Sequence, residues 1–424
     1  MSTMFFKNFI LFRLLVDALV FLTGQGAKAA SDDYFTTFIT GYADPIVYNI
    51  IFLLMTAAII FLGVNKGIES LSKILMPILF VMIIGIAIYS LTLKGSEETG
   101  GRTGIEGFGY YTIPNLDSVL NKEGFRSAII DVINKGEYHS LLLQYPLDLT
   151  NVTDYSVLHS TYHIDFFTYI FTYIGSINYG ALAMIIMDAM GQLFYSISVA
   201  MGIMVTYGSY FKDKDNLVKA VTRIDIFDTI VAFLAGVMII PAVYVFLGTE
   251  GLDNAGPGLL FVAMPKIFAQ MGLTGSILGG VFFLTVLFAA LTSCISIMEA
   301  ICSGMIDKGL SRGKATFLEG GIALVLSTVV CLGYNALYFE FKLPNGSTGQ
   351  LLDIMDYLSN NVLMPLLAIG TCILIGWVVK PKIVIDEATK NGEMFRRRHL
   401  YTVMVKYIAP ALLIILLLGS LGVY

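Results

Sequence analysis

The sequence has few charged side chains, only four cysteines and a single tryptophan. Of its 424 residues, 13% are charged and 56% are hydrophobic, and the mean hydropathy is +0.78. That balance excludes an ordinary soluble domain, in which about a quarter of the residues are charged. The net charge of −5 excludes the basic surface on which nucleic-acid binding depends. The composition therefore indicates an all-α polytopic membrane protein.

The cysteines and histidines show no catalytic or metal-binding pattern. The cysteines fall inside apolar stretches, without metal-ligand spacing or a pairing pattern, and are interpreted as small core residues. The histidines lie outside the predicted membrane spans. Because no nucleophile, histidine pair or metal set is present, we expect neither an enzyme nor an organic cofactor. The residues concerned are Cys294, Cys302, Cys331 and Cys372, and His139, His159, His163 and His399.

Apolar runs long enough to cross a bilayer recur along the chain. Strong spans are predicted at residues 45–64, 71–93, 226–247, 276–306, 315–337, 363–379 and 401–423, with a longer apolar region at 166–211. Residues 5–24 are a marginal span. A signal peptide is the alternative there, because Ala27-Lys-Ala-Ala30 resembles a cleavage site. Residues 257–271 are apolar but too short to cross, which predicts a re-entrant or surface helix.

The loops alternate between basic and acidic or nearly neutral. The basic loops lie near residues 66–73, 212–223, 308–314 and 380–398. Lysine and arginine concentrate in cytoplasmic loops of membrane proteins, so we assign these four loops to the cytoplasm. The long polar region at 94–165 is then predicted to be an extracellular insertion.

One apolar stretch, Gly191-Gln-Leu-Phe-Tyr-Ser-Ile-Ser-Val-Ala-Met-Gly202, is poorly suited to a continuous helix because small residues crowd its middle. An interrupted helix is tolerated in lipid only where its freed backbone groups face protein, water or a ligand. Secondary transporters build mid-membrane sites in this way. The alternative is a small-residue stripe that packs against another helix. We predict a break between about Ser196 and Gly202.

Polar side chains inside the other spans are candidates for the same site, since each is costly in hydrocarbon. Asp228 lies about one turn into the span predicted from residue 226, although it could instead reach the cytoplasmic surface. Thr292 and Ser293 lie at mid-depth of the span 276–306, where hydroxyls commonly bond a carbonyl one turn back. Hard cations prefer several oxygen ligands. One hydroxyl pair cannot supply such a set, but a pair that faces the broken helix could contribute to it.

These segments resemble the neurotransmitter:sodium symporter family in its shorter bacterial form. Residues 191–202 and Thr206-Tyr-Gly-Ser-Tyr210 resemble that family's unwound sixth helix, and Phe288-Ala-Ala-Leu-Thr-Ser293 its eighth. Gly63-Val-Asn-Lys-Gly-Ile-Glu69 resembles the junction of its fourth and fifth helices, and Gly236 with Ile239-Ile-Pro241 its seventh. The resemblance implies an inverted-repeat, broken-helix transporter bundle in a bacterial cytoplasmic membrane. It also implies Na⁺-coupled symport of an amino acid or related amine by alternating access.

The resemblance assigns roles to particular residues. It places Ser196 and Asp228 at a first Na⁺ site, so we expect these two residues to approach each other. The family more often has Asn in the second of these positions. A second Na⁺ site falls on Ala289, Thr292 and Ser293, which we expect to face the cavity left by the family's first helix. The substrate pocket is implied to include Tyr195, Ser196, Ser198, Met201 and Ile297. Asp356 and Gln192 correspond to an outer gate, and Tyr210 and Asp307 to an inner gate, with Glu299 near these two.

The family's first two helices, with their Gly-Leu-Gly-Asn segment, have no counterpart before residue 45. Residues 1–24 resemble part of the third helix and 45–423 the fourth to eleventh. The resemblance thus predicts one transmembrane transporter domain over 1–424, truncated at its N-terminal side. The alternative function is a truncated or split-gene member that is inactive alone, or that needs a partner fragment carrying the missing helices.

Overall fold

The computed structural model describes residues 2–97, 100–113, 119–135, 147, 153, 155–252, 258–344 and 346–423. Over these residues the chain is mostly helical, and it divides into two compact units. The first unit combines Met1–Tyr111 with Phe194–Tyr424, and the second is Thr112–Leu193. The candidate site lies in the first unit.

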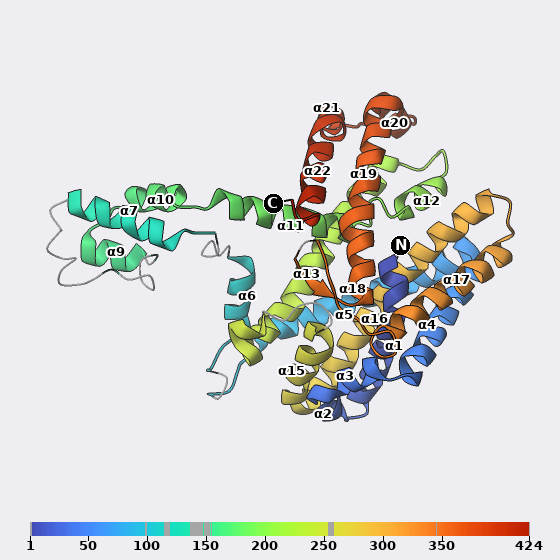
Figure 1. Ribbon diagram of the computed structural model, residues 1–424, viewed down its shortest axis with the longest axis horizontal. Coiled ribbons are helices and arrows are strands. Elements are labelled where there is room, and N and C mark those ends of the chain that lie inside the picture. Colours follow the sequence, from blue (N-terminus) through green and yellow to red (C-terminus); the bar gives the residue numbers. More distant parts are fainter. Residues whose placement is uncertain are drawn as a thin grey trace. The chain divides into compact units, whose positions relative to one another are not determined.

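Long apolar helices build the first unit (Figure 1). Among the described residues, seven helical stretches are long and apolar enough to cross a membrane, and every predicted strong span coincides with one of them. They are α4 (Ala43–Phe61), η1 with α5 (Val64–Glu69, Ser70–Thr92), α13 (Leu217–Gly251), α16 (Gly272–Asp307), α17 (Arg312–Leu332), α18 to η5 (Leu351–Asp356, Tyr357–Leu363, Met364–Ile373, Leu374–Val378), and α21 to α22 (Arg398–Val403, Met404–Ile408, Ala409–Ser420).

Helix α1 and several shorter elements complete this unit. Two strands of two residues each, β1 and β2, pair in antiparallel fashion. The apolar segment predicted at 257–271 forms two short helices whose side chains, including Ile267 and Phe268, are buried, and both are too short to cross. The elements are α1 (Ser2–Leu22), α2 (Gly26–Ala29), α3 (Asp32–Thr40), α6 (Gly104–Thr112), α12 (Ile203–Ser209), η3 (Leu259–Ala263), α15 (Met264–Gln270), β1 (Phe341–Lys342), β2 (Thr348–Gly349) and α20 (Pro381–Ala388).

Two helices begin earlier than hydropathy predicts, because polar caps start them. The Asn216 side chain accepts a hydrogen bond from the Lys219 backbone N–H at 2.8 Å, so α13 begins at Leu217 rather than near 226. At the start of α18, the Gln350 backbone N–H donates to Asp353 Oδ2 at 2.9 Å, and the helical stretch begins at Leu351 rather than near 363. The predicted spans therefore captured the apolar centres and missed the polar first turns.

Helix α1, predicted as a marginal span, packs inside the bundle beside α16 (Figure 1). The side chains of Leu14, Ala18 and Phe21 are fully buried. The Phe21 ring lies 5.7 Å from the Phe283 ring and occupies the space over Gly279, where a Cβ atom would come within 2.7 Å of it. Small residues on α16 thus admit a large aromatic side chain from α1.

A buried ion pair lies on the same helix. Arg13 Nε donates to Asp17 Oδ1 at 2.9 Å, and both residues are at most 5% exposed. The Arg13 guanidinium also lies over the rings of Tyr34 and Phe38, 4.0 and 4.5 Å from their centroids. Each charge therefore has a partner inside an otherwise apolar core.

The second unit has its own small core. It contains α7 (Lys122–Lys135), α9 (Tyr155–Tyr162), α10 (Phe166–Gly175) and the first part of α11 (Tyr179–Ser196). The side chains of Phe125, Ile129 and Leu158 are fully buried in it. The unit covers 112–193, whereas the sequence predicted an insertion at 94–165. The extracellular location of that region stays a prediction.

Candidate functional site

The helix break predicted from the sequence is confirmed. Helix α11 ends at Ser196 and α12 begins at Ile203, with six non-helical residues between them. Ser198, Ala200 and Gly202 have φ angles of 56°, 62° and 81°, in the left-handed region. Alternating left-handed residues prevent continuous i→i−4 hydrogen bonding, so backbone groups at the break become available.

The left-handed backbone at the break predicts opposite effects for two small substitutions. Gly202→Ala should lower the free energy of unfolding by about 1 kcal/mol, because alanine is strained at a left-handed φ angle. No steric clash adds to this cost, since no atom lies within 4 Å of the new Cβ. Ala200→Gly should be neutral or stabilising, whereas Ala→Gly within a helix costs about 1 kcal/mol. Chemical unfolding of the purified variants in detergent measures both. A helix-like loss for Ala200→Gly would contradict the left-handed assignment.

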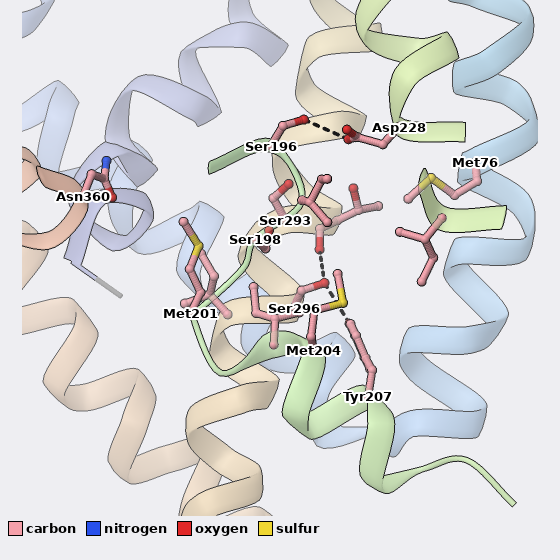
Figure 2. A pocket seen from close by; sticks show the side chains of 15 residues that line it. Met76, Ser196, Ser198, Met201, Met204, Tyr207, Asp228, Ser293, Ser296 and Asn360 are labelled. Carbon is pink, nitrogen blue, oxygen red and sulfur yellow. Dashed lines mark hydrogen bonds between the residues drawn. The ribbon is translucent and has the colours of Figure 1, made fainter. Parts of the chain in front are cut away.

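A cavity of about 300 Å³ opens at the break (Figure 2). Its walls come from the α11–α12 connection, α5, α12, α13, α16 and η4. The apolar lining consists largely of methionine and isoleucine side chains, including Met76, Met201, Met204 and Ile297. Polar atoms are contributed by Ser196, Ser198, Tyr207, Asp228, Thr292, Ser293, Ser296 and Asn360.

Ser196 and Asp228 meet at one edge of this cavity, as predicted. Ser196 Oγ donates to Asp228 Oδ1 at 2.8 Å (Figure 2). Because α13 starts at Leu217, Asp228 lies about three turns into the helix, deeper than the single turn predicted. The hydroxyl donates its proton to the carboxylate and keeps its own lone pairs, so this edge of the cavity is rich in negative oxygen atoms.

The two α16 hydroxyls also line the cavity. Thr292 Oγ1 and Ser293 Oγ donate to the Ala289 carbonyl oxygen at 2.9 and 3.1 Å. Both therefore make the intrahelical bond that hydroxyls in apolar helices commonly make. Their oxygen lone pairs remain as acceptors at the cavity. Ala289, which was also predicted to face the cavity, is not among its lining residues, and its carbonyl oxygen accepts both of these hydrogen bonds.

The remaining predicted residues fall in different places. Ser198, Met201 and Ile297 line the cavity, and the Tyr195 side chain lies outside the described residues. Asp356 Oδ1 accepts a hydrogen bond from Asn360 Nδ2 at 3.0 Å. Gln192 lies on α11 in the second unit, and Asp307 is exposed at the end of α16.

Tyr210 bonds to Glu299, which the family resemblance placed near it. Its hydroxyl donates to Glu299 Oε1 at 2.5 Å, and the Glu299 side chain is fully buried. Arg312 Nη2 donates to the other carboxylate oxygen at 2.5 Å, and Arg312 Nε donates to the Ile60 carbonyl at 2.8 Å. This network joins α12, α16, α17 and α4. The signal in the sequence was a glutamate inside an apolar span.

The set of oxygen donors suits a hard monovalent cation rather than a transition metal. A carboxylate, three hydroxyls and a backbone carbonyl come from α11, α13 and α16. Among the described residues there is no group of three or more His, Cys, Asp or Glu side chains that could hold a metal ion. Hydroxyl and carbonyl oxygens therefore have to supply most of any cation's ligands.

Comparison with known proteins gives a consistent result. The sodium:neurotransmitter symporter family matches residues 171–424. An uncharacterized sodium-dependent transporter from Haemophilus influenzae is 27% identical over 381 residues, which cover 89% of this chain and 65% of the relative. The sodium-dependent transporter YhdH from Bacillus subtilis is 27% identical over 393 residues, covering 92% and 69%. The chain thus spans about two thirds of the length of these relatives.

The fold matches a solved transporter structure. The crystal structure of MhsT in complex with L-phenylalanine superposes with a TM-score of 0.70 at 27% sequence identity, over 98% of this chain and 78% of that chain. The predicted broken-helix transporter bundle is therefore confirmed.

Proposed function

Because this chain belongs to the sodium:neurotransmitter symporter family, we propose that it is a Na⁺-coupled symporter of an amino acid or related amine. Members of this family are transporters, so the prediction that the chain is not an enzyme is confirmed. The observation that carries the proposal is the Ser196–Asp228 hydrogen bond at the helix break, beside a cavity lined by the α16 hydroxyls.

The proposed Na⁺ sites use the two oxygen-rich edges of the cavity. Ser196 and Asp228 hold the first ion, where the carboxylate supplies a full negative charge opposite the cation. Thr292, Ser293 and the Ala289 carbonyl contribute to the second. At an effective dielectric constant of 20, two unit charges 4 Å apart attract by about 4 kcal/mol, before desolvation is subtracted. The first site is therefore the more strongly electrostatic of the two.

The proposed substrate is an amino acid with an apolar or aromatic side chain. Met201 and Ile297 present apolar surface, while Ser198 and the open backbone of the break offer polar contacts. Tyr195 is proposed to contribute as well. The cavity volume of about 300 Å³ is at the small end of ligand pockets. The L-phenylalanine complex of MhsT supports an aromatic substrate of this size.

Transport by alternating access requires the cavity to close on each side in turn. Asp356 and Gln192 are proposed to act on the outer side, and Tyr210 and Asp307 on the inner side. The bond from Tyr210 to Glu299 supports this, because it ties the short helix α12 to α16. The proposed location is the bacterial cytoplasmic membrane.

The test is binding of radiolabelled L-phenylalanine to the purified protein, with Na⁺ replaced by K⁺ at constant ionic strength. We expect saturable binding in Na⁺ that is reduced at least about tenfold in K⁺, equivalent to 1.4 kcal/mol. Unlabelled apolar amino acids should compete. Equal binding in both salts would contradict Na⁺ coupling, whereas no binding in either salt would favour a family member that is inactive alone.

A further inference from the structure

A second glutamate is buried in the first unit, and it has no charge partner among the described residues. Glu319 lies two turns into α17 and is 4% exposed. Its carboxyl group makes no hydrogen bond or ion pair with any residue that the structure describes. The fully buried Glu299, by contrast, is bonded by Tyr210 and Arg312. A negative charge on Glu319 would therefore be left unbalanced in an apolar interior, which is costly.

Both glutamates lie near one thiol at the contact between α16 and α17. The Cys302 side chain on α16 is fully buried, and Glu319, Glu299 and Arg312 all lie close enough to act on it electrostatically. The guanidinium is already bonded to Glu299 and to a backbone carbonyl of α4. Lys314, the other basic residue of α17, is exposed. With both carboxyl groups ionised, this contact would hold two negative charges and one positive charge.

Helix α4 supplies no counter-charge at this level. It runs antiparallel beside α17, because Asn49 Nδ2 donates to Ser327 Oγ at 2.7 Å while the Ile60 carbonyl bonds the first residue of α17. Glu319 lies between these two contacts, opposite about residues 53–57. That stretch, Leu-Leu-Met-Thr-Ala, has no titratable side chain.

The remaining titratable groups of the packed helices are elsewhere. On α4, Asp44 and Tyr48 lie in the first two turns, near the far end of α17. On α1, which also packs against α17, Arg13 is balanced by Asp17 on the same helix. The side chain of Lys7 is outside the described residues. Within the described part of these helices, no unpaired cation therefore faces α17 at this level.

A buried hydroxyl near Glu319 also lacks a partner. Thr316 lies one turn earlier on the same side of α17 and is 4% exposed, yet its Oγ1 has no hydrogen-bond partner among the described residues. Its neighbour on α16 is the Cys302 thiol, a weak hydrogen-bonding group. An ionised carboxylate only accepts hydrogen bonds, whereas a protonated carboxyl group also donates one. A proton on Glu319 thus removes the charge and supplies the donor that the Thr316 oxygen lacks.

We propose that Glu319 is a proton-binding site in the interior of the membrane domain and carries a proton at neutral pH. A proton fits this place better than Na⁺, because a hard metal cation needs several oxygen ligands and the surroundings offer one hydroxyl and a thiol. Loss of the proton would create a second negative charge near Arg312, which would compete with Glu299 for the guanidinium. The network that joins α12, α16, α17 and α4 should therefore weaken as the pH rises. The inference does not rest on the proposed transport function.

Infrared spectroscopy of the purified full chain in detergent tests the proton directly, because the C=O stretch of a protonated carboxyl group is separate from the bands of carboxylates and amides. We expect such a band in the unchanged protein at neutral pH and its loss in Glu319→Gln. Glu69→Gln is the matched control and should keep the band, since Glu69 is exposed and its carboxylate is paired with Lys73 at 2.8 Å. If Glu319→Gln does not fold, Glu319→Asp serves instead, because a protonated aspartate should shift the band in frequency.

Chemical unfolding at a series of pH values gives an independent measurement. Unfolding exposes Glu319 to water, where its carboxyl group ionises, so unfolding releases the proton and higher pH favours the unfolded chain. In the neutral range, each pH unit should raise the unfolding equilibrium constant up to about tenfold more in the unchanged protein than in Glu319→Gln.

Three results would overturn the proposal. One is a band that survives in Glu319→Gln or keeps its frequency in Glu319→Asp. Another is an equal pH dependence of unfolding in the unchanged protein and in Glu319→Gln. The third is a band that disappears when Na⁺ replaces K⁺, because the carboxylate would then bind a metal cation. Neither measurement needs substrate, so a failure of the proposed transport function leaves both interpretable.

Discussion

Arg312→Ala is expected to lower the free energy of unfolding by about 3 kcal/mol, because it leaves the Glu299 carboxylate buried without its charge partner. The Glu299 side chain is fully buried, and the Arg312 guanidinium also bonds the Ile60 carbonyl of α4. Removal of the guanidinium thus unpairs the buried charge and takes one hydrogen bond from the Ile60 carbonyl. Chemical unfolding in detergent, followed by circular dichroism, measures the change.

The exposed ion pair of Lys390 with Asp213 provides the control. Its atoms are 3.0 Å apart, but the two side chains are 48% and 90% exposed. The hydrogen bond from Lys390 to Asp213 raises the pKa of the lysine, yet water competes for both charges. Lys390→Ala should change the free energy of unfolding by less than about 1 kcal/mol. Adding Glu299→Gln to Arg312→Ala should restore part of the stability, because the buried charge is then removed. Equal losses of stability in Arg312→Ala and Lys390→Ala would contradict this account.

Asp228→Asn is expected to raise the Na⁺ concentration for half-maximal L-phenylalanine binding by roughly tenfold or more, equivalent to at least 1.4 kcal/mol. The amide keeps an oxygen that can accept from Ser196, but it removes the full charge that faces the proposed ion. Asp228→Leu removes both and should abolish Na⁺-dependent binding. Titration of Na⁺ at fixed labelled substrate gives both values.

Thr229→Ala is the matched control, since Thr229 follows Asp228 in α13 and its exposed hydroxyl donates to the Asp225 carbonyl. This variant should bind Na⁺ and substrate as the unchanged protein does. An unchanged Na⁺ dependence in Asp228→Leu would remove Asp228 from the cation site. A similar loss in Thr229→Ala would show that α13 is sensitive to any substitution there.

The helix break and the contact between Ser196 and Asp228 could be predicted because their causes are local or shared with a known family. Serine and glycine weaken a helix wherever it lies, and an acidic residue inside an apolar span indicates a polar partner. The family resemblance then connected α11 with α13. The roles of these residues in binding stay predictions that the two Asp228 variants test.

Other features depend on contacts that no segment shows by itself. The start of α13 is set by the Asn216 cap, and hydropathy does not locate it because hydropathy marks only the apolar part of a helix. Arg312 looked like one of several basic loop residues, and its bonds to Glu299 and Ile60 depend on how α16, α17 and α4 pack. The separate core of the second unit brings together residues from three helices.

The contact between Phe21 and Gly279 has a consequence for the order of synthesis. The two residues are separated by about 260 positions, so α1 leaves the ribosome long before its partner surface on α16 exists. At about 5–20 residues per second, the delay is roughly 13–50 s. Throughout that time α1 must remain in the membrane with Arg13 and Asp17 in its sequence.

The Arg13–Asp17 ion pair lowers the free-energy cost of holding α1 in the membrane during this delay. Its two members are four residues apart on one helix, so their hydrogen bond forms as soon as α1 does. The nascent helix therefore offers surrounding lipid a nearly neutral pair instead of two separate charges. An ion pair that is buried in the folded bundle thus first lowers the cost of keeping α1 in lipid before α16 is synthesised.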